Sequence, residues 1–182
     1  MPELTMRVSV ETDLDAETAE RYYELYYDTF KDLETRAVAR QLLHRHEFLE
    51  EMHDPRVMKY IAWEGDLAIG LTTLTNHLET VPWISPRYFE HHYPEHWARG
   101  AVYYLGITLV ERNHQNSDVF QTMIAAATEL ILAERAVCAW DICHFNDEVL
   151  GLGPAISRML DTVPQLAVGP IDKQTYFAAV HE

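Results

Sequence analysis

Residues 101–110 read AVYYLGITLV, an apolar run of strand length without a charged side chain. A continuous apolar run of this kind is typical of a strand that is covered on both faces of its sheet. Residues 119–135 then place apolar side chains three and four positions apart, which predicts a helix. We therefore expect a buried strand that leads into a helix, and the other elements can be placed around this unit.

The sequence that precedes this strand predicts one strand, two helices and a hairpin. Residues 6–11 alternate apolar and polar side chains, and residues 16–33 and 37–52 show the apolar spacing of helices. Residues 57–63 and 67–75 are rich in apolar and β-branched side chains and flank a Glu-Gly-Asp turn. This pattern predicts a β-hairpin.

The sequence that follows the helix predicts further strands and a helical stretch. Residues 137–145 form a second apolar run, which predicts another buried strand. A helical stretch from residue 146 is interrupted by two glycines and a proline, and residues 165–168 and 175–180 have the composition of strands. Because 182 residues fit one domain of ordinary size, we expect residues 1–182 to form a single α/β domain.

The chain is strongly acidic, with 14 Lys and Arg against 29 Asp and Glu and a formal net charge of −15. A nucleic-acid binder needs a basic surface that neutralises phosphates, so nucleic acid is not expected as a partner. The same negative field favours an amine substrate over an acidic one.

Neither a secretory leader nor a membrane span is expected from the sequence. Residues 1–10 have no apolar run of signal-peptide length, and nowhere do about 18 uncharged apolar residues follow one another. Cys138 and Cys143 would lie roughly 16 Å apart on an extended strand, which is too far for a disulfide. These features predict a soluble protein of the reducing cytoplasm.

The segment that joins the buried strand to the helix carries a specific pattern. Residues 108–110 end the strand, Gln115 opens the loop, and Met123 and Ile124 form an apolar pair in the helix. With the order of elements, this segment resembles the GNAT N-acyltransferase superfamily, in which an Arg/Gln-Gly-x-Gly-x-Gly/Ala loop cradles a pyrophosphate. The resemblance covers nearly the whole chain and implies a mostly antiparallel sheet with a parallel central strand pair, flanked by helices.

The resemblance also implies an activity, a cofactor and an acceptor. Members of the superfamily transfer an acyl group from acetyl-CoA or another acyl-CoA to an amine, so a small-molecule amine acceptor is expected. A backbone N–H near the end of the buried strand would polarise the thioester carbonyl. The residues that the resemblance assigns to the cofactor are Leu109, Val110, Gln115, Asn116, Ser117, Asp118, Val119, Phe120 and Asn146.

The loop departs from the family pattern at each of its glycine positions, which hold Asn116, Asp118 and Phe120. Glycine lets backbone N–H groups approach a pyrophosphate at the positive end of a helix. Phe120 would obstruct that approach, and Asp118 would repel the phosphates. The alternative interpretation is an ordinary capped helix start with Asn116 or Ser117 as the N-cap.

The catalytic residues must also differ from the family pattern. Many members use as general acid a Tyr seven residues after an Asn that corresponds to Asn146, and Gly153 occupies that position here. Tyr104, one of two adjacent tyrosines on the buried strand, is a candidate acid or else a core aromatic. Asp141 would be desolvated in an apolar strand and is a candidate base, or else a hydrogen-bonded or arginine-paired carboxylate. His144 is a candidate proton shuttle or a polar residue at a strand end.

Residues 77–100 form an insertion with three prolines, several aromatic side chains and several histidines. We expect an irregular loop, and a lid over an acceptor pocket, a hydrophobic plug and a homodimer surface all fit its composition. His92 and His96 have the spacing of metal ligands on a helix, but Pro94 between them would break that helix. No metal site is therefore expected.

Two functions remain open at this point. The first is an acyl-CoA-dependent N-acyltransferase. The second is a catalytically inactive domain of the same fold that binds a small ligand or another protein through the aromatic segment. The missing glycines and the missing Tyr favour the second function, and the fold alone does not decide between them.

Overall fold

The computed structural model describes residues 6–39, 42–115 and 118–181. The chain divides into two compact units. The first unit is formed by Met1–Lys31 and Leu43–Asp141, and the second by Asp32–Leu42 and Ile142–Glu182. That residues 1–182 act as one domain stays a prediction.

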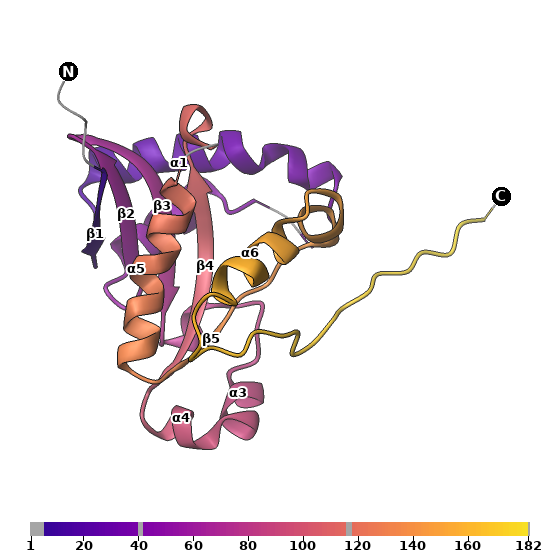
Figure 1. Ribbon diagram of the computed structural model, residues 1–182. Coiled ribbons are helices and arrows are strands. Elements are labelled where there is room, and N and C mark those ends of the chain that lie inside the picture. The colour runs from indigo at the N-terminus through magenta and orange to yellow at the C-terminus, as the bar shows by residue number, and fades with distance from the viewer. Residues whose placement is uncertain (1–5, 40–41, 116–117, 182) are drawn as a thin grey trace. The chain divides into compact units, whose positions relative to one another are not determined.

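A five-stranded mixed sheet forms the centre of the first unit (Figure 1). Its strands follow chain order across the sheet, and all neighbours are antiparallel except the last two strands, which are parallel. This arrangement confirms the expected mixed sheet with one parallel pair. The strands are β1 (Met6–Glu11), β2 (Met58–Glu64), β3 (Leu67–Thr75), β4 (Val102–Val110) and β5 (Val137–Ala139).

The helices of the first unit include two long ones, predicted from their apolar spacing. Asp15 caps the first of them, since its carboxylate accepts a hydrogen bond from the backbone N–H of Thr18 at 3.0 Å. Among the described residues no helix is long and apolar enough to cross a membrane. The α-helices of this unit are α1 (Ala16–Phe30), α2 (Arg45–His53), α3 (Pro86–His92), α4 (Pro94–Ala98) and α5 (Val119–Ala133).

Helix α5 crosses one face of the sheet (Figure 1) and packs most closely where β3 has no side chain. A Cβ atom at Gly70 would lie 2.8 Å from Cγ1 of Val119 and 2.9 Å from Cε of Met123. Both of these side chains are almost fully buried. The small residue therefore sets how closely α5 approaches the sheet.

We expect Gly70→Ala to lower the free energy of unfolding by about 2 kcal/mol, because overpacking a well-filled core usually costs 1–3 kcal/mol. Urea denaturation of the purified protein measures this change. Leu67→Ala is a suitable control, because Leu67 lies on the same strand but is 40% exposed. An unchanged midpoint for the glycine variant would show that α5 has room to move away.

A β-bulge interrupts the ladder between β3 and β4. Thr72 pairs with Thr108 and Leu74 pairs with Leu105, so Gly106 and Ile107 both lie opposite Thr73. An extra residue of this kind bends a strand and increases its twist. The bulge lies where β4 changes from fully buried residues to partly exposed ones.

Two of the predicted elements of the first unit are shorter than expected. The helix predicted over residues 37–52 begins only at Arg45, because the N–H of His44 donates to the Glu47 carboxylate at 2.7 Å and so closes the helix start there. The strand predicted over residues 137–145 ends at Ala139, where its pairing with β4 ends. Both predictions were wrong in length because apolar composition extended beyond the hydrogen-bonded element.

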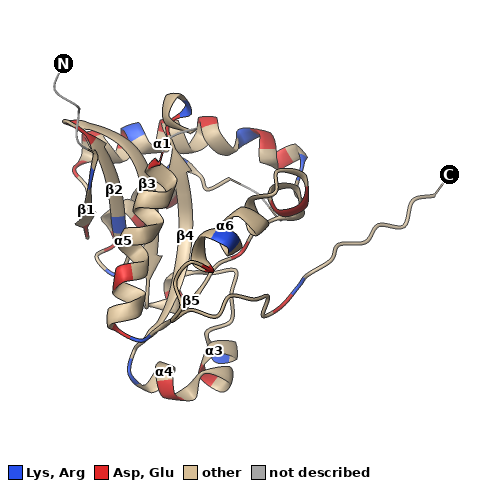
Figure 2. Cartoon of the chain, viewed as in Figure 1, with Lys and Arg blue, Asp and Glu red and all other residues tan. Residues whose placement is uncertain are grey.

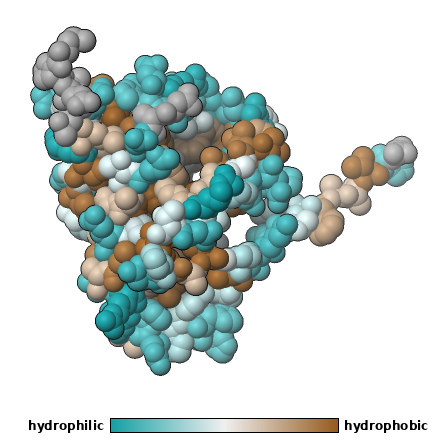
Figure 3. Space-filling view, viewed as in Figure 1, coloured by the Kyte–Doolittle hydropathy of each residue, from teal (hydrophilic) through white to brown (hydrophobic). Residues whose placement is uncertain are grey.

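The second unit contains a π-helical turn, Phe145–Val149, followed by α6 (Leu152–Leu160) and an irregular tail. The strands predicted over residues 165–168 and 175–180 are wrong, because both segments are irregular and largely exposed. Phe177 and Val180 in this tail are 92% and 82% exposed, and Figure 3 shows apolar atoms near its free end. A strand needs a paired neighbour, and no described strand pairs with the tail.

Candidate functional site

Strands β4 and β5 pair over only a short distance. The parallel ladder joins Val102–Tyr104 of β4 to Val137–Ala139 of β5 and ends there. Beyond Tyr104, the described part of β4 pairs only with β3. No described strand therefore pairs with Leu105–Val110 of β4 on the side of β5, and we call this unpaired stretch the open edge of β4.

Tyr104, Asp141 and Trp83 form a hydrogen-bonded cluster where the ladder ends. The hydroxyl group of Tyr104 donates to Oδ1 of Asp141 at 2.5 Å. The indole Nε1–H of Trp83 faces both partners, at 3.2 Å from Oδ1 of Asp141 and 3.3 Å from the hydroxyl of Tyr104. The two predicted residues of the first unit, the acid and the base, are thus in direct contact.

Burial differs sharply within this cluster. Tyr104 is only 3% exposed and packs in the core with Phe89 and Ala139. Trp83 is 53% exposed, and Asp141 is exposed as well. The cluster therefore joins the core of the sheet to the protein surface.

The position of Asp141 differs from the prediction that placed it within a buried strand. Asp141 follows the end of β5 by two residues and is exposed. The expected desolvation of its carboxylate is therefore not found. Its carboxylate is instead fixed by the donors of Tyr104 and Trp83. A fixed and accessible carboxylate can still accept a proton or hold a cation.

The insertion over residues 77–100 is more regular than predicted. It contains α3 and α4, each of which begins with a proline, as suits the first turn of a helix. Leu78, Val81 and Phe89 pack against Val102 and Tyr104 of β4, so the insertion covers this end of the strand. Whether it acts as a lid or as a dimer surface stays a prediction.

The histidines of the insertion lie on separate helices. His92 ends α3 and His96 lies in α4, because Pro94 separates the two. Among the described residues no group of three or more His, Cys, Asp or Glu side chains could hold a metal ion.

The start of α5 contains the residues predicted to bind a cofactor. The N-cap position is occupied by Asp118. Asn116 and Ser117, which the alternative interpretation placed at the cap, lie outside the described part of the chain. The side chain of Asp118 makes no capping hydrogen bond and is exposed, as is Gln115. Phe120 is half-buried.

Three further predicted cofactor residues contribute mainly to packing. Val119 is 1% exposed and points at Gly70, and Leu109 is 2% exposed. Val110 packs against the cluster of buried side chains that includes Val119. Only the backbone of these residues is suited to contact a ligand.

Cys138 lies on β5 beside the open edge. Burial raises the pKa of its thiol to about 12, although a hydrogen bond with the backbone of Leu105 acts in the opposite direction. The residue as a whole is half-buried, but the sulfur itself is desolvated. Cys138 is therefore a neutral thiol at physiological pH and not a nucleophile.

His144, Asn146 and Gly153 belong to the second unit. His144 is exposed and precedes the π-helical turn that contains the half-buried Asn146. A Cβ atom at Gly153 would collide with the carboxylate of Asp147, so a larger residue at this position requires the side chain of Asp147 to move. The roles of His144 and Asn146 stay predictions.

A buried lysine on β2 was not predicted from the sequence as a notable residue. Lys59 on β2 is 0% exposed, and its Nζ donates to the backbone oxygens of Thr12 at 2.9 Å and Asp54 at 2.7 Å. Burial lowers the pKa of Lys59 to about 8, whereas nearby carboxylates, among them Glu51, act in the opposite direction. The signal in the sequence was a single lysine within the otherwise apolar strand MKYIAW.

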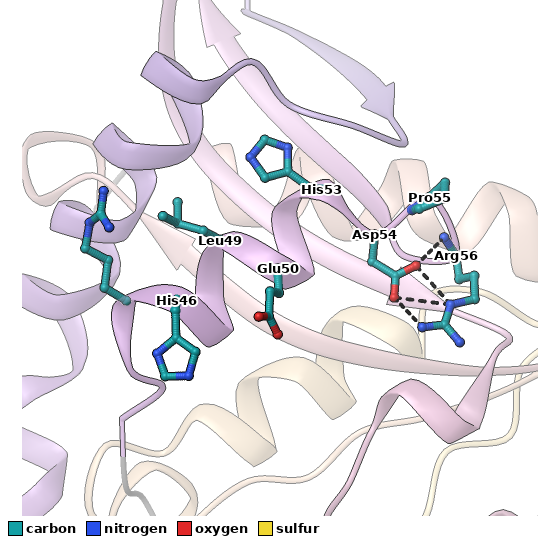
Figure 4. Close-up of a pocket in the computed structure, with 8 residues that line it drawn as sticks. His46, Leu49, Glu50, His53, Asp54, Pro55 and Arg56 are labelled. Carbon is teal, nitrogen blue, oxygen red and sulfur yellow. Dashed lines mark hydrogen bonds and ion pairs between the residues drawn. The ribbon is translucent and has the colours of Figure 1, made fainter.

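A separate hollow of about 690 Å³ lies on the outer face of α2 (Figure 4). None of the predicted site residues contributes to it. Figure 4 shows Asp54 and Arg56 joined by hydrogen bonds, the shortest of which is 2.6 Å, and these bonds hold the pKa of Asp54 below its usual value. The charges of this pair are thus already neutralised by each other. The lining residues are Arg45, His46, Leu49, Glu50, His53, Asp54, Pro55 and Arg56.

Acidic side chains are spread over several helices of the first unit. Figure 2 shows Asp and Glu on α1, α3, α4 and α5. This distribution agrees with the net charge of −15.

Comparisons with solved structures identify proteins of the same architecture. A GCN5-related N-acetyltransferase from Ralstonia eutropha JMP134 superposes with a TM-score of 0.59 at 16% identity, over 96% of this chain and 99% of that one. The aminoglycoside N-acetyltransferase AAC(6')-Iy, in complex with CoA, gives 0.57 at 12% identity over 96% and 95%. The aminoglycoside acetyltransferase meta-AAC0020 from an uncultured soil metagenomic sample, in complex with trehalose, gives 0.53 at 11% identity over 95% and 97%.

The comparisons of sequence gave no match. No protein-family model matches the chain, and no curated protein matches it either. At identities of 11–16%, the structural likeness shows the fold and not the activity.

Proposed function

Because the chain has the fold of the GNAT acetyltransferases, we propose that it transfers an acyl group from an acyl-CoA thioester to a small-molecule amine. The observation that carries this proposal is the open edge of β4, which begins beside the hydrogen-bonded pair of Tyr104 and Asp141. An extended ligand arm can pair with such an edge through backbone hydrogen bonds. The Tyr104 hydroxyl, as proton donor, and the Asp141 carboxylate, as proton acceptor, then lie at the Leu105 end of this edge.

The residues present are compatible with an acyl-CoA. The start of α5 is the positive end of a helix, and helix starts of this kind bind phosphate. The charge of Asp118 opposes this binding, which should make it weaker than in a glycine-rich loop. From Val110 to Tyr104 the strand spans about 20 Å, so an arm that follows β4 connects the two regions.

The chemistry of the proposed site divides between two side chains. A bound acyl-CoA would supply an acyl group activated as a thioester. The Tyr104 hydroxyl can give a proton to a leaving group, and the Asp141 carboxylate can take a proton from an amine. Their mutual hydrogen bond provides a path by which the proton returns from Asp141 to Tyr104. Cys138 takes no part, because its thiol is neutral.

An amine acceptor is supported by charge and by the comparisons. Asp141 is an accessible carboxylate next to the exposed indole of Trp83, and this pairing suits an ammonium group. Two of the structural neighbours are named as aminoglycoside acetyltransferases, and aminoglycosides are amines. Two free cysteines and a CoA substrate are consistent with the cytoplasm as the place of action.

We expect acetyl-CoA to bind with a dissociation constant below about 1 mM, which corresponds to about −4 kcal/mol. Isothermal titration calorimetry of the purified protein measures this affinity. Phe120→Gly should tighten binding, because it clears the first turn of α5 for the phosphates. If affinity does not change in this variant, the phosphates do not lie at this helix start.

The absence of binding at millimolar acetyl-CoA would reject the acyltransferase proposal. The exposed charge of Asp118 and the bulk of Phe120 would then favour the second function, a domain of this fold that binds another small ligand or a protein.

A further inference from the structure

Trp83 is held at the protein surface by a short turn of the insertion. The backbone N–H of Ile84 donates to the backbone oxygen of Val81 at 3.4 Å, and Pro82 occupies the second position of this turn, which suits its fixed φ angle. Val81 is buried, and Ile84 packs against the buried cluster that contains Val81. Because both ends of the turn are anchored in the core, Trp83 between them is presented to the solvent.

The side chain of Trp83 has a defined orientation. Its Nε1–H, the only polar group of the indole, faces Oδ1 of Asp141 at 3.2 Å and the hydroxyl of Tyr104 at 3.3 Å. The rings of Trp83 and Tyr104 meet edge to face, with centroids 6.4 Å apart and planes at 74°. The N–H edge of the indole is therefore turned toward the carboxylate, and ring carbons form the remaining surface.

The exposure of Trp83 distinguishes it from the other tryptophans. Of the four tryptophans, all of which the structure describes, only Trp83 is exposed, at 53%, and the other three are half-buried. Tryptophan is highly buried on average. Because the N–H of Trp83 is already bonded, a ligand that covers its ring removes apolar surface from water without leaving a polar atom unpaired.

The cluster of Trp83, Tyr104 and Asp141 offers one carboxylate and one exposed apolar ring. An ammonium group held by the exposed Asp141 has the indole beside it, so the carbon atoms attached to its nitrogen lie along the ring. A flat aromatic body stacks well on such a ring, and pairs of rings contribute more than their buried area alone. A polycationic amine needs further carboxylates for its other ammonium groups, whereas this cluster contains one.

We propose that Trp83 is a specificity-determining residue of the site that it forms with Tyr104 and Asp141, and that it selects primary amines with one ammonium group and a flat apolar body over polycationic amines. That the selected amine is an acyl acceptor rests on the proposed function, whereas its binding can be tested without an acyl donor. The neighbours named as aminoglycoside acetyltransferases would then differ from this chain in the amine that they take.

The first test measures amine binding to the full chain without an acyl donor. The four tryptophans give four indole N–H signals in a nitrogen-15 spectrum, and the signal that is missing in Trp83→Phe identifies Trp83. We expect 2-phenylethylammonium to shift this signal and to bind about tenfold more tightly than ethylammonium, because only the aryl amine covers the ring. Equal affinities, or an unshifted Trp83 signal, would overturn the proposal.

Two substitutions separate the ring of Trp83 from its hydrogen bond, with the amide signal of Asp141 as the report of binding. Trp83→Phe keeps an apolar ring and removes the donor, so a preference of about threefold or more for the aryl amine should remain. Trp83→Gln keeps a donor and removes the ring, so the two amines should bind within about twofold of each other. A tenfold preference that persists in the glutamine variant would contradict the proposed role of the ring.

Trp97→Phe is the matched control for these substitutions. Trp97 belongs to the same insertion, but its half-buried side chain packs against the buried cluster. This variant should keep the tenfold preference of the wild type for the aryl amine. An equal loss of preference in the Trp97 and Trp83 variants would mean that the packing of the insertion, and not the ring of Trp83, selects the amine.

The last test asks whether the selection applies to acyl transfer. With acetyl-CoA, kcat/KM for 2-phenylethylamine should exceed that for ethylamine and for an aminoglycoside by about tenfold, and Trp83→Gln should lose this advantage through a higher KM. A higher kcat/KM for the aminoglycoside would overturn the selection and leave the proposed function intact. If no amine is acylated while the aryl amine still binds at Trp83, the proposed function fails and the binding measurements still support recognition by Trp83.

Discussion

Asp141→Asn is expected to lower the turnover number about a hundredfold, because removing a general base typically costs a factor of 10² to 10⁴. The amide retains an oxygen that accepts from the hydroxyl of Tyr104 and the indole of Trp83, so the geometry of the cluster is kept. What the variant loses is the ability to accept a proton from the amine. The release of free CoA thiol, with acetyl-CoA and a panel of primary amines, measures the rate.

Asp66→Asn is the matched control for this experiment. Asp66 lies in the turn between β2 and β3 and is exposed, so the substitution removes the same charge away from the cluster. Its turnover should equal that of the wild type. Full turnover in the Asp141 variant would exclude this carboxylate as the base, and Tyr104→Phe would then show whether the hydroxyl acts without it.

Phe48→Ala is expected to lower the free energy of unfolding by about 4 kcal/mol, within the range of 3–5 kcal/mol for a buried Phe. Phe48 is 0% exposed and its ring packs against Tyr26 and Tyr23, with centroid distances of 5.0 Å and 5.7 Å. These contacts join α2 to α1. The loss of the ring would leave a cavity that the aromatic neighbours can fill only in part.

Chemical denaturation monitored by circular dichroism measures this loss. Glu50→Ala is the control on the same helix, because Glu50 is exposed and alanine also favours a helix. The control should change stability by less than about 0.5 kcal/mol. A loss below about 1 kcal/mol for the phenylalanine variant would mean that α2 is held mainly by other contacts.

Apolar patterns in the sequence predicted the central elements of the first unit. Strand β4 was expected from a continuous apolar run, the hairpin of β2 and β3 from apolar and β-branched segments around a turn, and helix α5 from apolar side chains three and four positions apart. The same reasoning predicted too long a strand over residues 137–145, because an apolar run does not show how far a neighbouring strand pairs with it. The expected strands of the tail failed for the same reason.

The candidate site could be predicted only in part. Tyr104 and Asp141 were both proposed, and they meet although 37 positions separate them in the chain. Trp83 was noted only as an aromatic residue, because its bond to Asp141 depends on the packing of the insertion. The hydrogen bond from the Ile107 N–H to Thr73 was not predicted, because it depends on the bulge, and no repeat in the sequence marks the bulge.

The bulge changes the face of the sheet to which the later side chains of β4 point. Tyr104 pairs with Thr75 and Leu109 with Leu71, so these two residues of β4 share a face although five positions separate them. Regular alternation would place them on opposite faces. The loss of one residue at the bulge would therefore leave β4 almost as long as before but would turn Leu109 toward α5 and reverse every side chain that follows. The one extra residue at the bulge thus determines the face of the sheet to which each side chain in the second half of β4 points.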